Sequence, residues 1–460
     1  DQANAFKGGF DFEETDKGLW VMEGGRWETY GAPLVRTWSK LAQDANAGAA
    51  EVIVENDVSD WSVGGNIVLS STRMPVEYYI RDSPPPPKEE KRYFPEHEVR
   101  IIQSLQKLSD GKTQITLDKP LQFKHEGVAP FRGEVAFLTR NILVKTEIQG
   151  VSESTLITDP TTRKFAHTMF MMGSKGNIQY AEFKQMGNAG TLSRYTIHPH
   201  QMLESSKGMV IRGNSGWYTG FRCVNLHVTH GILVEDNVCF NSLSTSFFVE
   251  EDDTAGRNED NVFVHNIGIA SLSKASDDDA GESLASDFWP GSSTDHEAFL
   301  VNVAAGDGGN EYTQYGFHFP EAGNSHGSFG IMPFTFVSNE AHSKTSNGFR
   351  AWQNQYPSRE IIDLRSWRNG DTGIEWGAYA NYMKIFNAQV LENGKLGLDI
   401  GSVNSFLQDS TITGYGIDNS PRDNGVNILA YNAAQTPMHP LWYVRNTFKN
   451  LKTAGFDQDH

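Results

Sequence analysis

The chain has 460 residues, of which 38% are hydrophobic and 21% charged, as in a globular protein that buries a large core. With 39 basic and 57 acidic residues, the formal net charge of −18 opposes binding to nucleic acid, because phosphate recognition needs a basic face. The sequence contains no run of about 18 apolar residues, so it predicts no membrane-spanning helix.

The N-terminal part of the sequence predicts short strands joined by tight turns. It starts at Asp1 without a Met, as a processed chain would, and we expect secretion to the extracellular space or the periplasm. In residues 51–71 short β-branched runs alternate with turn residues, and residues 113–117 alternate like a half-buried strand. We therefore expect a β-rich domain over residues 1–130. It should pack against the rest of the chain, because no Gly/Ser-rich linker follows it.

From about residue 135 onward, short apolar runs beside Asn or Gly recur at steps of roughly 20–35 residues, a period typical of solenoids. Each unit is too short to bury its own apolar face, but stacking on the next unit would bury it. An Asn at a bend can bond the backbone and the Asn of the next coil. The pattern predicts an all-β chain with a parallel β-helix over residues 131–460. The recurring residues are Asn237, Asn266, Asn302, Asn339, Asn369, Asn387 and Asn404.

Two cysteines, Cys223 and Cys239, lie within this repeat region. Two are too few for a disulfide framework. They could pair, or both could be buried thiols. Buried thiols are slightly favoured, because an unpaired cysteine behaves as a small apolar residue.

The densest group of polar residues begins with Arg194, His198 and His200. In an extended segment, histidines at i and i+2 lie on one face, because side chains alternate along a strand. The following units supply His230 and then the adjacent Glu250 and Glu251. Equivalent positions in stacked coils lie about 4.8 Å apart. Three coils could therefore align an arginine, imidazoles and carboxylates, a set that provides acid–base groups for a glycosidic bond and a cation for an acidic sugar.

The same segment offers metal ligands. His198, His200 and Glu204 have the spacing of a cupin metal site, and imidazoles with a carboxylate suit zinc, nickel, manganese or iron. A cupin fold is disfavoured, since it needs antiparallel strands. Acidic turns could hold calcium through oxygen ligands. The cofactor hypothesis is thus a divalent ion, either calcium or a first-row transition metal. His227 is interpreted as a structural histidine.

Aromatic and arginine side chains near this group are candidates for substrate binding. Tyr195 and Trp217 flank the histidines in sequence, and Trp289 falls near the end of a coil. Aromatic faces stack on the apolar faces of sugar rings. The guanidinium of Arg222 could hold a substrate carboxylate through two hydrogen bonds. We expect these four residues to bind a polysaccharide.

Several segments resemble the family of the cell-migration-inducing hyaluronan-binding protein. They are AEFKQMG (181–187), LSRYTIHPH (192–200), THGILVEDNV (229–238), FFVEED (247–252) and NVFVHNIG (261–268). Upstream, GGRWETYGAP and DVSDWSVGGNIVLSST resemble the glycine-rich β domain of that family, and the resemblance runs over roughly residues 24–410. It implies a right-handed parallel β-helix and an extracellular role in hyaluronan depolymerisation. The acidic, Cys-poor composition suits a bacterial relative.

Two functional hypotheses follow. The first is a secreted depolymerase that cleaves hyaluronan or another uronate polymer, either by hydrolysis or by β-elimination; a lyase needs a base for the C5 proton and a cation for the uronate carboxylate. The alternative is a non-catalytic, extracellular glycan-binding protein that uses the same arginine and aromatic side chains. The expected partner in both is a polysaccharide, with no nucleic acid and no membrane insertion.

Overall fold

The computed structural model describes sixteen stretches of the chain. They are residues 17–75, 95–147, 152–159, 162–250, 256–272, 285–289, 294–295, 297–306, 314–319, 335–351, 359–376, 383–400, 405–414, 425–427, 442–450 and 456–457. Among these residues, no helix is long and apolar enough to cross a membrane.

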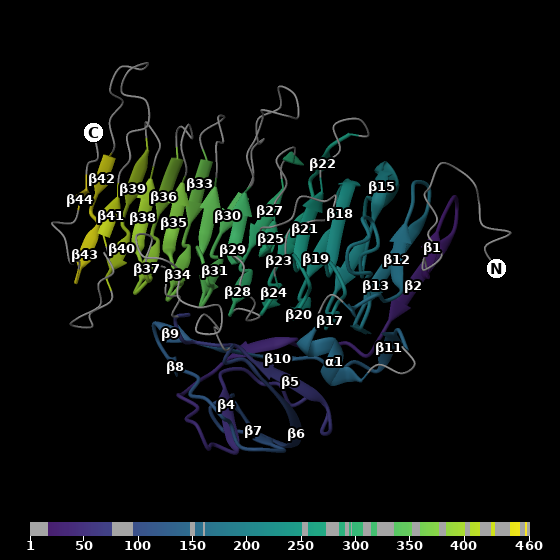
Figure 1. Ribbon diagram of the computed structural model, residues 1–460, viewed down its shortest axis with the longest axis horizontal. Coiled ribbons are helices and arrows are strands. Elements are labelled where there is room, and N and C mark those ends of the chain that lie inside the picture. Colours follow the sequence, from purple (N-terminus) through teal and green to yellow (C-terminus); the bar gives the residue numbers. More distant parts are fainter. Residues whose placement is uncertain are drawn as a thin grey trace.

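Three long parallel sheets form the body of the protein, and each coil from β13 onward adds one strand to each of them (Figure 1). The first sheet contains β2 (Arg26–Tyr30), β13 (Lys175–Gln179), β16 (Val210–Arg212), β19 (Leu233–Glu235), β23 (Val262–Val264), β27 (Ala298–Leu300), β30 (Thr335–Val337), β33 (Arg359–Ile362), β36 (Met383–Phe386), β39 (Phe406–Gln408) and β42 (Trp442–Val444).

The second sheet contains β11 (Ile142–Lys145), β14 (Ala181–Lys184), β17 (Ser215–Trp217), β20 (Val238–Phe240), β24 (Ile267–Ile269), β28 (Val303–Ala305), β31 (Glu340–His342), β34 (Arg365–Trp367), β37 (Gln389–Leu391), β40 (Thr411–Thr413) and β43 (Thr447–Lys449). The third sheet contains β15 (His200–Leu203), β18 (Val224–Thr229), β21 (Phe247–Glu250), β25 (Ala285–Trp289), β29 (Gln314–Phe319), β32 (Phe349–Ala351), β35 (Thr372–Trp376), β38 (Leu396–Ile400), β41 (Gly425–Asn427) and β44 (Phe456–Asp457). The predicted fold class, an all-β chain with a right-handed parallel β-helix and an N-terminal β domain packed against it, is confirmed.

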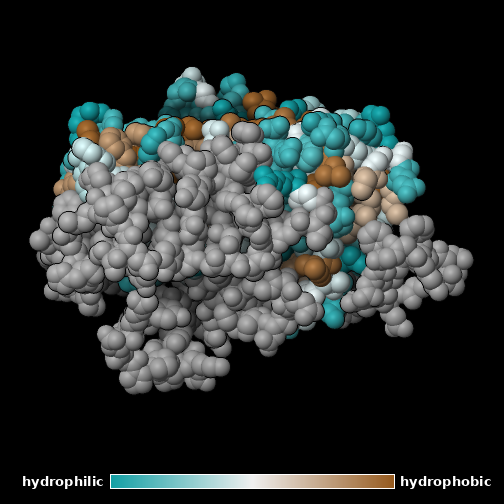
Figure 2. All heavy atoms as spheres, turned by 90° about the horizontal axis from the view of Figure 1, so that it is seen from above, coloured by the Kyte–Doolittle hydropathy of each residue, from teal (hydrophilic) through white to brown (hydrophobic). Residues whose placement is uncertain are grey.

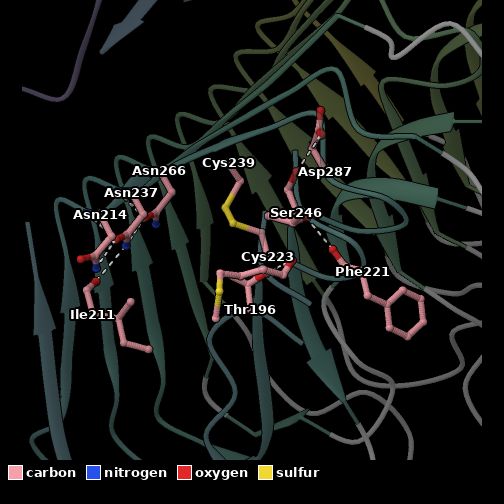
Figure 3. Close-up of a disulfide and its surroundings, with 12 residues drawn as sticks. Thr196, Ile211, Asn214, Phe221, Cys223, Asn237, Cys239, Ser246, Asn266 and Asp287 are labelled. Atoms are coloured by element: carbon pink, nitrogen blue, oxygen red, sulfur yellow. Dashed lines mark hydrogen bonds between the residues drawn. A yellow bond between two sulfur atoms is a disulfide. The ribbon is translucent and has the colours of Figure 1, made fainter. Parts of the chain in front are cut away.

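The corner between the first and second sheets is built on the predicted asparagines. The residue before the corner takes a left-handed conformation, as at Asp236 with φ of 56°, and so turns the chain. Asn237 Nδ2 then donates to Asn266 Oδ1 at 2.9 Å and to the Ile211 carbonyl at 2.8 Å (Figure 3). The ladder of side-chain bonds runs through Asn214, Asn237, Asn266, Asn302 and Asn339.

The C-terminal asparagines divide into different roles. Asn369 Nδ2 donates to Asn393 Oδ1 at 2.9 Å and so repeats the ladder. Asn387, by contrast, is exposed and donates to Asp363 Oδ1. Asn404 lies outside the described residues. The recurrence of Asn thus marked the corners without separating ladder positions from surface positions.

The interior of the β-helix is apolar and stacks in columns. The rings of Phe247, Phe288 and Phe317 lie on consecutive rungs, with centroids 4.8 and 4.9 Å apart. Cys223 and Cys239 belong to this core and form a disulfide (Figure 3). The slight preference for two buried thiols was therefore wrong, because the coil brings the two positions together across the core.

The first described residues already belong to the β-helix. β1 (Gly18–Val21) pairs in parallel with β12 (His167–Phe170), and β2 pairs in parallel with β13. The strand pairings therefore differ from the predicted boundary between residues 130 and 131. The antiparallel N-terminal sheet contains β3 (Trp38–Lys40), β10 (Glu134–Phe137), β5 (Asn66–Leu69), β6 (Glu98–Lys107), β7 (Thr113–Leu117) and β4 (Glu51–Val54), so it ends beyond residue 131.

Few other elements complete the described part of the chain. Two short strand pairs are β8 (Gly127–Val128) with β9 (Phe131–Arg132), and β22 (Asn258–Glu259) with β26 (Thr294–Asp295). The helical segments are α1 (Glu153–Thr158) and one 3-10 turn at Glu204–Ser206. Seen from above Figure 1, the visible described residues are mostly hydrophilic, with small apolar groups between them (Figure 2).

The antiparallel sheet covers the outer face of the second parallel sheet. Trp38 packs with Trp217 and Phe240 in one apolar cluster, and its ring stacks on His265 at 4.2 Å. In Figure 1 the antiparallel strands accordingly lie below β17, β20, β24 and β28. The N-terminal domain thus closes one face of the β-helix.

Charged side chains within this interface form a buried network. Lys40 Nζ lies 2.6 Å from Glu340 Oε2 and 3.1 Å from Glu134 Oε1. Glu134 Oε2 lies 3.0 Å from His342 Nε2, and both side chains are 0% exposed. Arg365 adds a further pair with Glu340 at 3.2 Å. We call these five residues the interface network.

Candidate functional site

The candidate site lies on the outer face of the third sheet, where strand register aligns polar side chains. His200 pairs with His227, and His227 pairs with Glu250, so these residues occupy one position on three consecutive rungs. Their neighbours Leu226 and Val249 belong to the apolar core. Because side chains alternate across a strand, His227 and Glu250 point away from the core.

Three histidines meet at this place. His198, two residues before His200, lies on the same face, and its ring centroid is 5.0 Å from that of His200. The His200 and His227 centroids are 4.6 Å apart, with the ring planes at 90°. The ligand nitrogen atoms of all three lie within 4.8 Å of one another. We call His198, His200 and His227 the histidine cluster.

Glu250 borders the histidine cluster and is held by polar partners. Its Oε2 lies 3.1 Å from Arg222 Nη1 and accepts a hydrogen bond from Asn225 Nδ2 at 2.8 Å. The same oxygen lies 3.8 Å from His227 Nδ1 and 4.0 Å from His198 Nε2. On the other side, Tyr195 Oη donates to Oε1 at 3.5 Å. The carboxylate is thus fixed beside the imidazoles.

Electrostatics keep these groups in defined protonation states. Burial, together with the neighbouring His200 and His227, lowers the pKa of His198 well below its usual range, so its imidazole is neutral at pH 7. Burial acts to raise the pKa of Glu250, but Arg222, His227 and Asn225 outweigh it and leave this pKa lower than usual. The site therefore pairs an ionised carboxylate with a neutral imidazole at pH 7.

Of the predicted binding residues, Arg222 and Tyr195 belong to the site, although neither is an open binding surface. The Arg222 guanidinium lies over the Phe248 ring at 3.5 Å and over the Tyr195 ring at 4.6 Å. Tyr195 is 0% exposed, so its ring packs in the structure and cannot stack on a sugar. Trp289 is half-buried on the next rung and stacks on Phe248 with centroids 5.3 Å apart.

The structure places three other predicted residues elsewhere. Trp217 lies on the second sheet, where its Nε1 donates to Glu182 and the N-terminal domain covers it. Trp217 is therefore a packing residue of the interface, because β17 faces the antiparallel sheet. Glu204 and His230 bond each other at 2.9 Å, and the Glu204 side chain is 69% exposed.

The pairing of Glu204 with His230 corrects the predicted grouping. His230 Nε2 also lies 3.2 Å from the Arg257 carbonyl, so both ring nitrogens are engaged away from the histidine cluster. The expected metal set of His198, His200 and Glu204 is thus not brought together. His227 takes the third position instead, since register aligns it with His200.

Arg194 and Glu251 complete the predicted set. The Arg194 guanidinium lies over the Trp20 ring on the first rung at 5.1 Å. Glu251 lies outside the described residues. The sequence did not predict a role for Asn225, and His227 was interpreted as a structural histidine. The signal that could have found both is their spacing of 27 residues from His198 and His200, one coil of the helix.

A second polar group continues along the same face. His318, Arg350, Glu375 and Asp399 follow one another in register on β29, β32, β35 and β38. Arg350 Nε lies 3.2 Å from Glu375 Oε2, and its Nη1 donates to Tyr315 Oη at 2.7 Å. We call these five residues the distal cluster.

The distal cluster also holds perturbed groups. Burial and then Arg350 lower the pKa of His318 to about 3. Burial raises the pKa of Glu375 against the opposing effect of Arg350, with Asp399 adding to the rise. Burial likewise raises the pKa of Asp399. Perturbed titratable groups gather at functional sites more often than elsewhere.

Comparison with known proteins identifies the segment that carries the histidine cluster. Residues 164–349 match the family model described as the CEMIP beta-helix, named after the cell-migration-inducing hyaluronan-binding protein. These residues are therefore related to the CEMIP beta-helix family. The relation predicted from the sequence motifs is confirmed, and the matched segment includes the histidine cluster and Glu250.

Curated relatives are larger proteins. A G8 domain-containing protein of Dictyostelium discoideum is 28% identical over 71% of this chain, which spans 27% of that protein. The cell surface hyaluronidase of Danio rerio is 26% identical over 64% of this chain, which spans 22% of it. Human cell surface hyaluronidase CEMIP2 is 28% identical over 46% of this chain, which spans 15% of it.

Solved structures give weaker likenesses to this chain. The periplasmic alginate epimerase AlgG has a TM-score of 0.43 at 10% identity, covering 67% of this chain and 68% of its own. A GH87 alpha-1,3-glucanase from Streptomyces thermodiastaticus has a TM-score of 0.38 at 8% identity, covering 92% of this chain and 89% of its own. Neither likeness identifies a substrate.

Proposed function

We propose that this chain is an extracellular enzyme that cleaves an acidic polysaccharide, such as hyaluronan or another uronate polymer, on the outer face of the third sheet. The observation that carries the proposal is the register of His200, His227 and Glu250 on three consecutive rungs. Titratable side chains that lie side by side on one face can take part in acid–base cleavage of a glycosidic bond, which supports the proposal.

The protonation states of the site support this chemistry. A neutral imidazole such as that of His198 can accept a proton, and the ionised Glu250 carboxylate can stabilise the imidazolium that results. In hydrolysis the proton would come from a water that attacks the anomeric carbon. In β-elimination it would come from C5 of a uronate. In both reactions the glycosidic C–O bond would break, and the leaving oxygen would take its proton from the imidazolium, which becomes neutral again.

The length of the polar face supports a polymeric substrate. Outward side chains continue in register from Asn225 through Phe248 and Trp289 to the distal cluster. From β15 to β38 the face spans roughly 34 Å, at about 4.8 Å per rung. Trp289 between the two clusters offers a ring for stacking on a sugar. We therefore assign the distal cluster to binding of the same polymer.

Relatives and covalent structure support the substrate and the compartment. Two relatives are named as cell surface hyaluronidases. The Cys223–Cys239 disulfide is typical of an oxidising compartment. The net charge of −18 repels a polyanion only at long range, because salt screens it beyond about 8 Å. Recognition of an acidic sugar would therefore depend on local cations.

The test is incubation of the full chain with acidic and neutral polysaccharides, read by polymer size, by new reducing ends and by ultraviolet absorbance. Shortened acidic polymer supports the proposal. An unsaturated chromophore identifies elimination, and reducing ends without one identify hydrolysis. Unchanged polymer that co-elutes with the chain would replace cleavage by the alternative, a non-catalytic glycan-binding protein. Faster cleavage of a neutral polymer would overturn the acidic substrate.

The distal cluster has its own test. We expect Arg350→Lys to raise KM for long polymer by about 10-fold and to leave KM for short oligosaccharides nearly unchanged, because Lys keeps the charge but loses the planar fork. Equal effects on both substrates would remove the distal cluster from binding.

A further inference from the structure

The histidine cluster has the composition of a metal centre. Three imidazoles, 0%, 8% and 8% exposed for His198, His200 and His227, place their ligand nitrogens within 4.8 Å of one another. Two of them alternate on one extended segment and the third is aligned on the next rung. The backbone register, rather than flexible side chains, therefore sets the spacing of the donors.

The tautomer of His198 is fixed by its other ring nitrogen. Nδ1 lies 3.0 Å from the Ser193 carbonyl, which can only accept, so Nδ1 carries the proton. Nε2 then holds a lone pair, is buried, and has no hydrogen-bond partner among the described residues. A backbone carbonyl that orients an imidazole in this way is a common feature around metal-bound histidines.

The arrangement is unfavourable without a cation. A buried acceptor without a partner has lost its hydrogen bonds to water and gained none in return, and the Nε2 atom of His198 faces the Glu250 carboxylate, 4.0 Å away. Two acceptors facing each other repel. A metal ion between them would turn this repulsion into coordination.

We propose that His198, His200 and His227 bind a divalent first-row transition metal, with the Glu250 carboxylate beside it. Nitrogen donors favour zinc, cobalt, nickel or iron, whereas calcium prefers a shell made only of oxygen atoms. The donor set thus chooses between the two cofactor classes that the sequence left open. Such an ion would supply Lewis acidity to the proposed cleavage. With the ion bound, His198 Nε2 is a ligand, and the ionised Glu250 carboxylate is left as the proton acceptor. Binding of the ion does not depend on that activity.

The experiment measures binding without substrate. The full chain is treated with chelator, and Co²⁺ is then titrated while visible absorbance is recorded; Zn²⁺ is titrated by calorimetry and by thermal melting. We expect one equivalent of either ion, absorption bands typical of nitrogen-ligated Co²⁺, and a higher Tm with Zn²⁺. X-ray absorption of the Zn²⁺ form should show imidazole ligands.

Substitutions distinguish the proposed ligands His198, His200 and His227 from the set expected from the sequence, in which Glu204 takes the place of His227. His227→Leu and His200→Leu should weaken Zn²⁺ binding by at least about 100-fold, with the metal-free Tm near that of the wild type. Glu204→Gln should leave affinity unchanged, because Glu204 faces His230. If Glu204→Gln abolished binding while His227→Leu retained it, the ion would occupy a surface site and the inference would be overturned.

Failure of this inference and failure of the proposed function can be distinguished. Absence of Co²⁺ bands and of Zn²⁺ stabilisation in a chain that still cleaves polysaccharide would refute the metal site alone. Tight binding that requires His227, in a chain that cleaves none of the polymers tested, would support the site and count against the proposed function. Should His227→Leu fail to fold, His200→Leu and the absorption spectrum decide.

Discussion

The second and third sheets each carry buried histidine and glutamate side chains, but these side chains have different partners on the two sheets. On the second sheet, the N-terminal domain covers the interface network, and each charge there has an opposite charge nearby. On the third sheet, His198, His200 and His227 face one another, and His198 Nε2 has no hydrogen-bond partner among the described residues.

The difference separates a structural use of buried charge from a functional one. Glu134 is surrounded by Lys40, His342 and Ser70, which together overcome the effect of burial and lower its pKa. Each carboxylate of this network therefore lies within 3.2 Å of a basic side chain. The histidine cluster instead gathers three imidazoles, and the buried Nε2 of His198 has no hydrogen-bond partner among the described residues. Burial of charge alone is thus a poor sign of function; incomplete partnering is a better one.

The strongest test of this difference is to replace one histidine by leucine on each of the two sheets. His227→Leu should lower the rate of polysaccharide cleavage by about 10²–10⁴-fold, since it removes a side chain of the proposed active site. The Tm should change by only a few degrees, because His227 lies on an outer face. Steady-state kinetics beside a thermal melt check this. Wild-type turnover in His227→Leu would mean that the third sheet does not hold the active site.

On the covered face, His342→Leu should have the opposite effect, with a large loss of stability and little change in activity. It removes a partner of Glu134 inside a dry interface, which typically costs about 3–5 kcal/mol of stability. Cleavage per folded molecule should stay at the wild-type rate below the unfolding temperature. Chemical denaturation monitored by tryptophan fluorescence measures the loss. A cost under about 1 kcal/mol would show that Lys40 alone satisfies Glu134.

The asparagine ladder at the corner between the first and second sheets predicts a smaller difference in stability between a buried and an exposed substitution. Asn266 Nδ2 donates to Asn302 Oδ1 at 3.1 Å and to the Val234 carbonyl at 2.9 Å, fully buried. Asn266→Ala should cost about 1–3 kcal/mol, because neighbouring ladder groups lose their partners. Gln389→Ala replaces an exposed amide on β37 as the control and should change stability by less than about 0.5 kcal/mol. Equal effects in denaturant melts would contradict a ladder.

The low pKa of His318 in the distal cluster predicts that the stability of the folded chain depends on pH. Burial and Arg350 lower the pKa of His318 to about 3, so the unfolded chain takes up a proton below about pH 6.5 while the folded chain does not. Stability should therefore fall on acidification by about 1.4 kcal/mol per pH unit between roughly pH 6 and pH 4.

Replacing His318 isolates its contribution to this pH dependence of stability. His318→Phe keeps an aromatic ring beside Trp289 and Tyr315 but cannot titrate, so its stability should fall less over the same pH range. The difference between the two slopes, from urea melts at several pH values, is the quantity to measure. Parallel slopes would mean that His318 is protonated in the folded protein.

The sequence by itself determined the architecture and part of the site. Recurring Asn after short apolar runs predicts a stack of coils, because each coil needs the same corner and the same buried face. The alternation of His198 and His200 likewise follows from the period of a strand. These are local properties, and the structure confirms the corners at Asn237 and Asn266 and the shared face of the two histidines.

Only the tertiary structure decided what depends on register between coils. Coil lengths vary, so the sequence could not tell whether Glu204 or His227 joins His198 and His200; strand pairing selects His227. Nor could it show that the N-terminal domain covers Trp217, that Cys223 meets Cys239 across the core, or that residues 18–30 open the β-helix. Each of these contacts joins residues whose separation in sequence is set by loops, and loops carry no periodic signal.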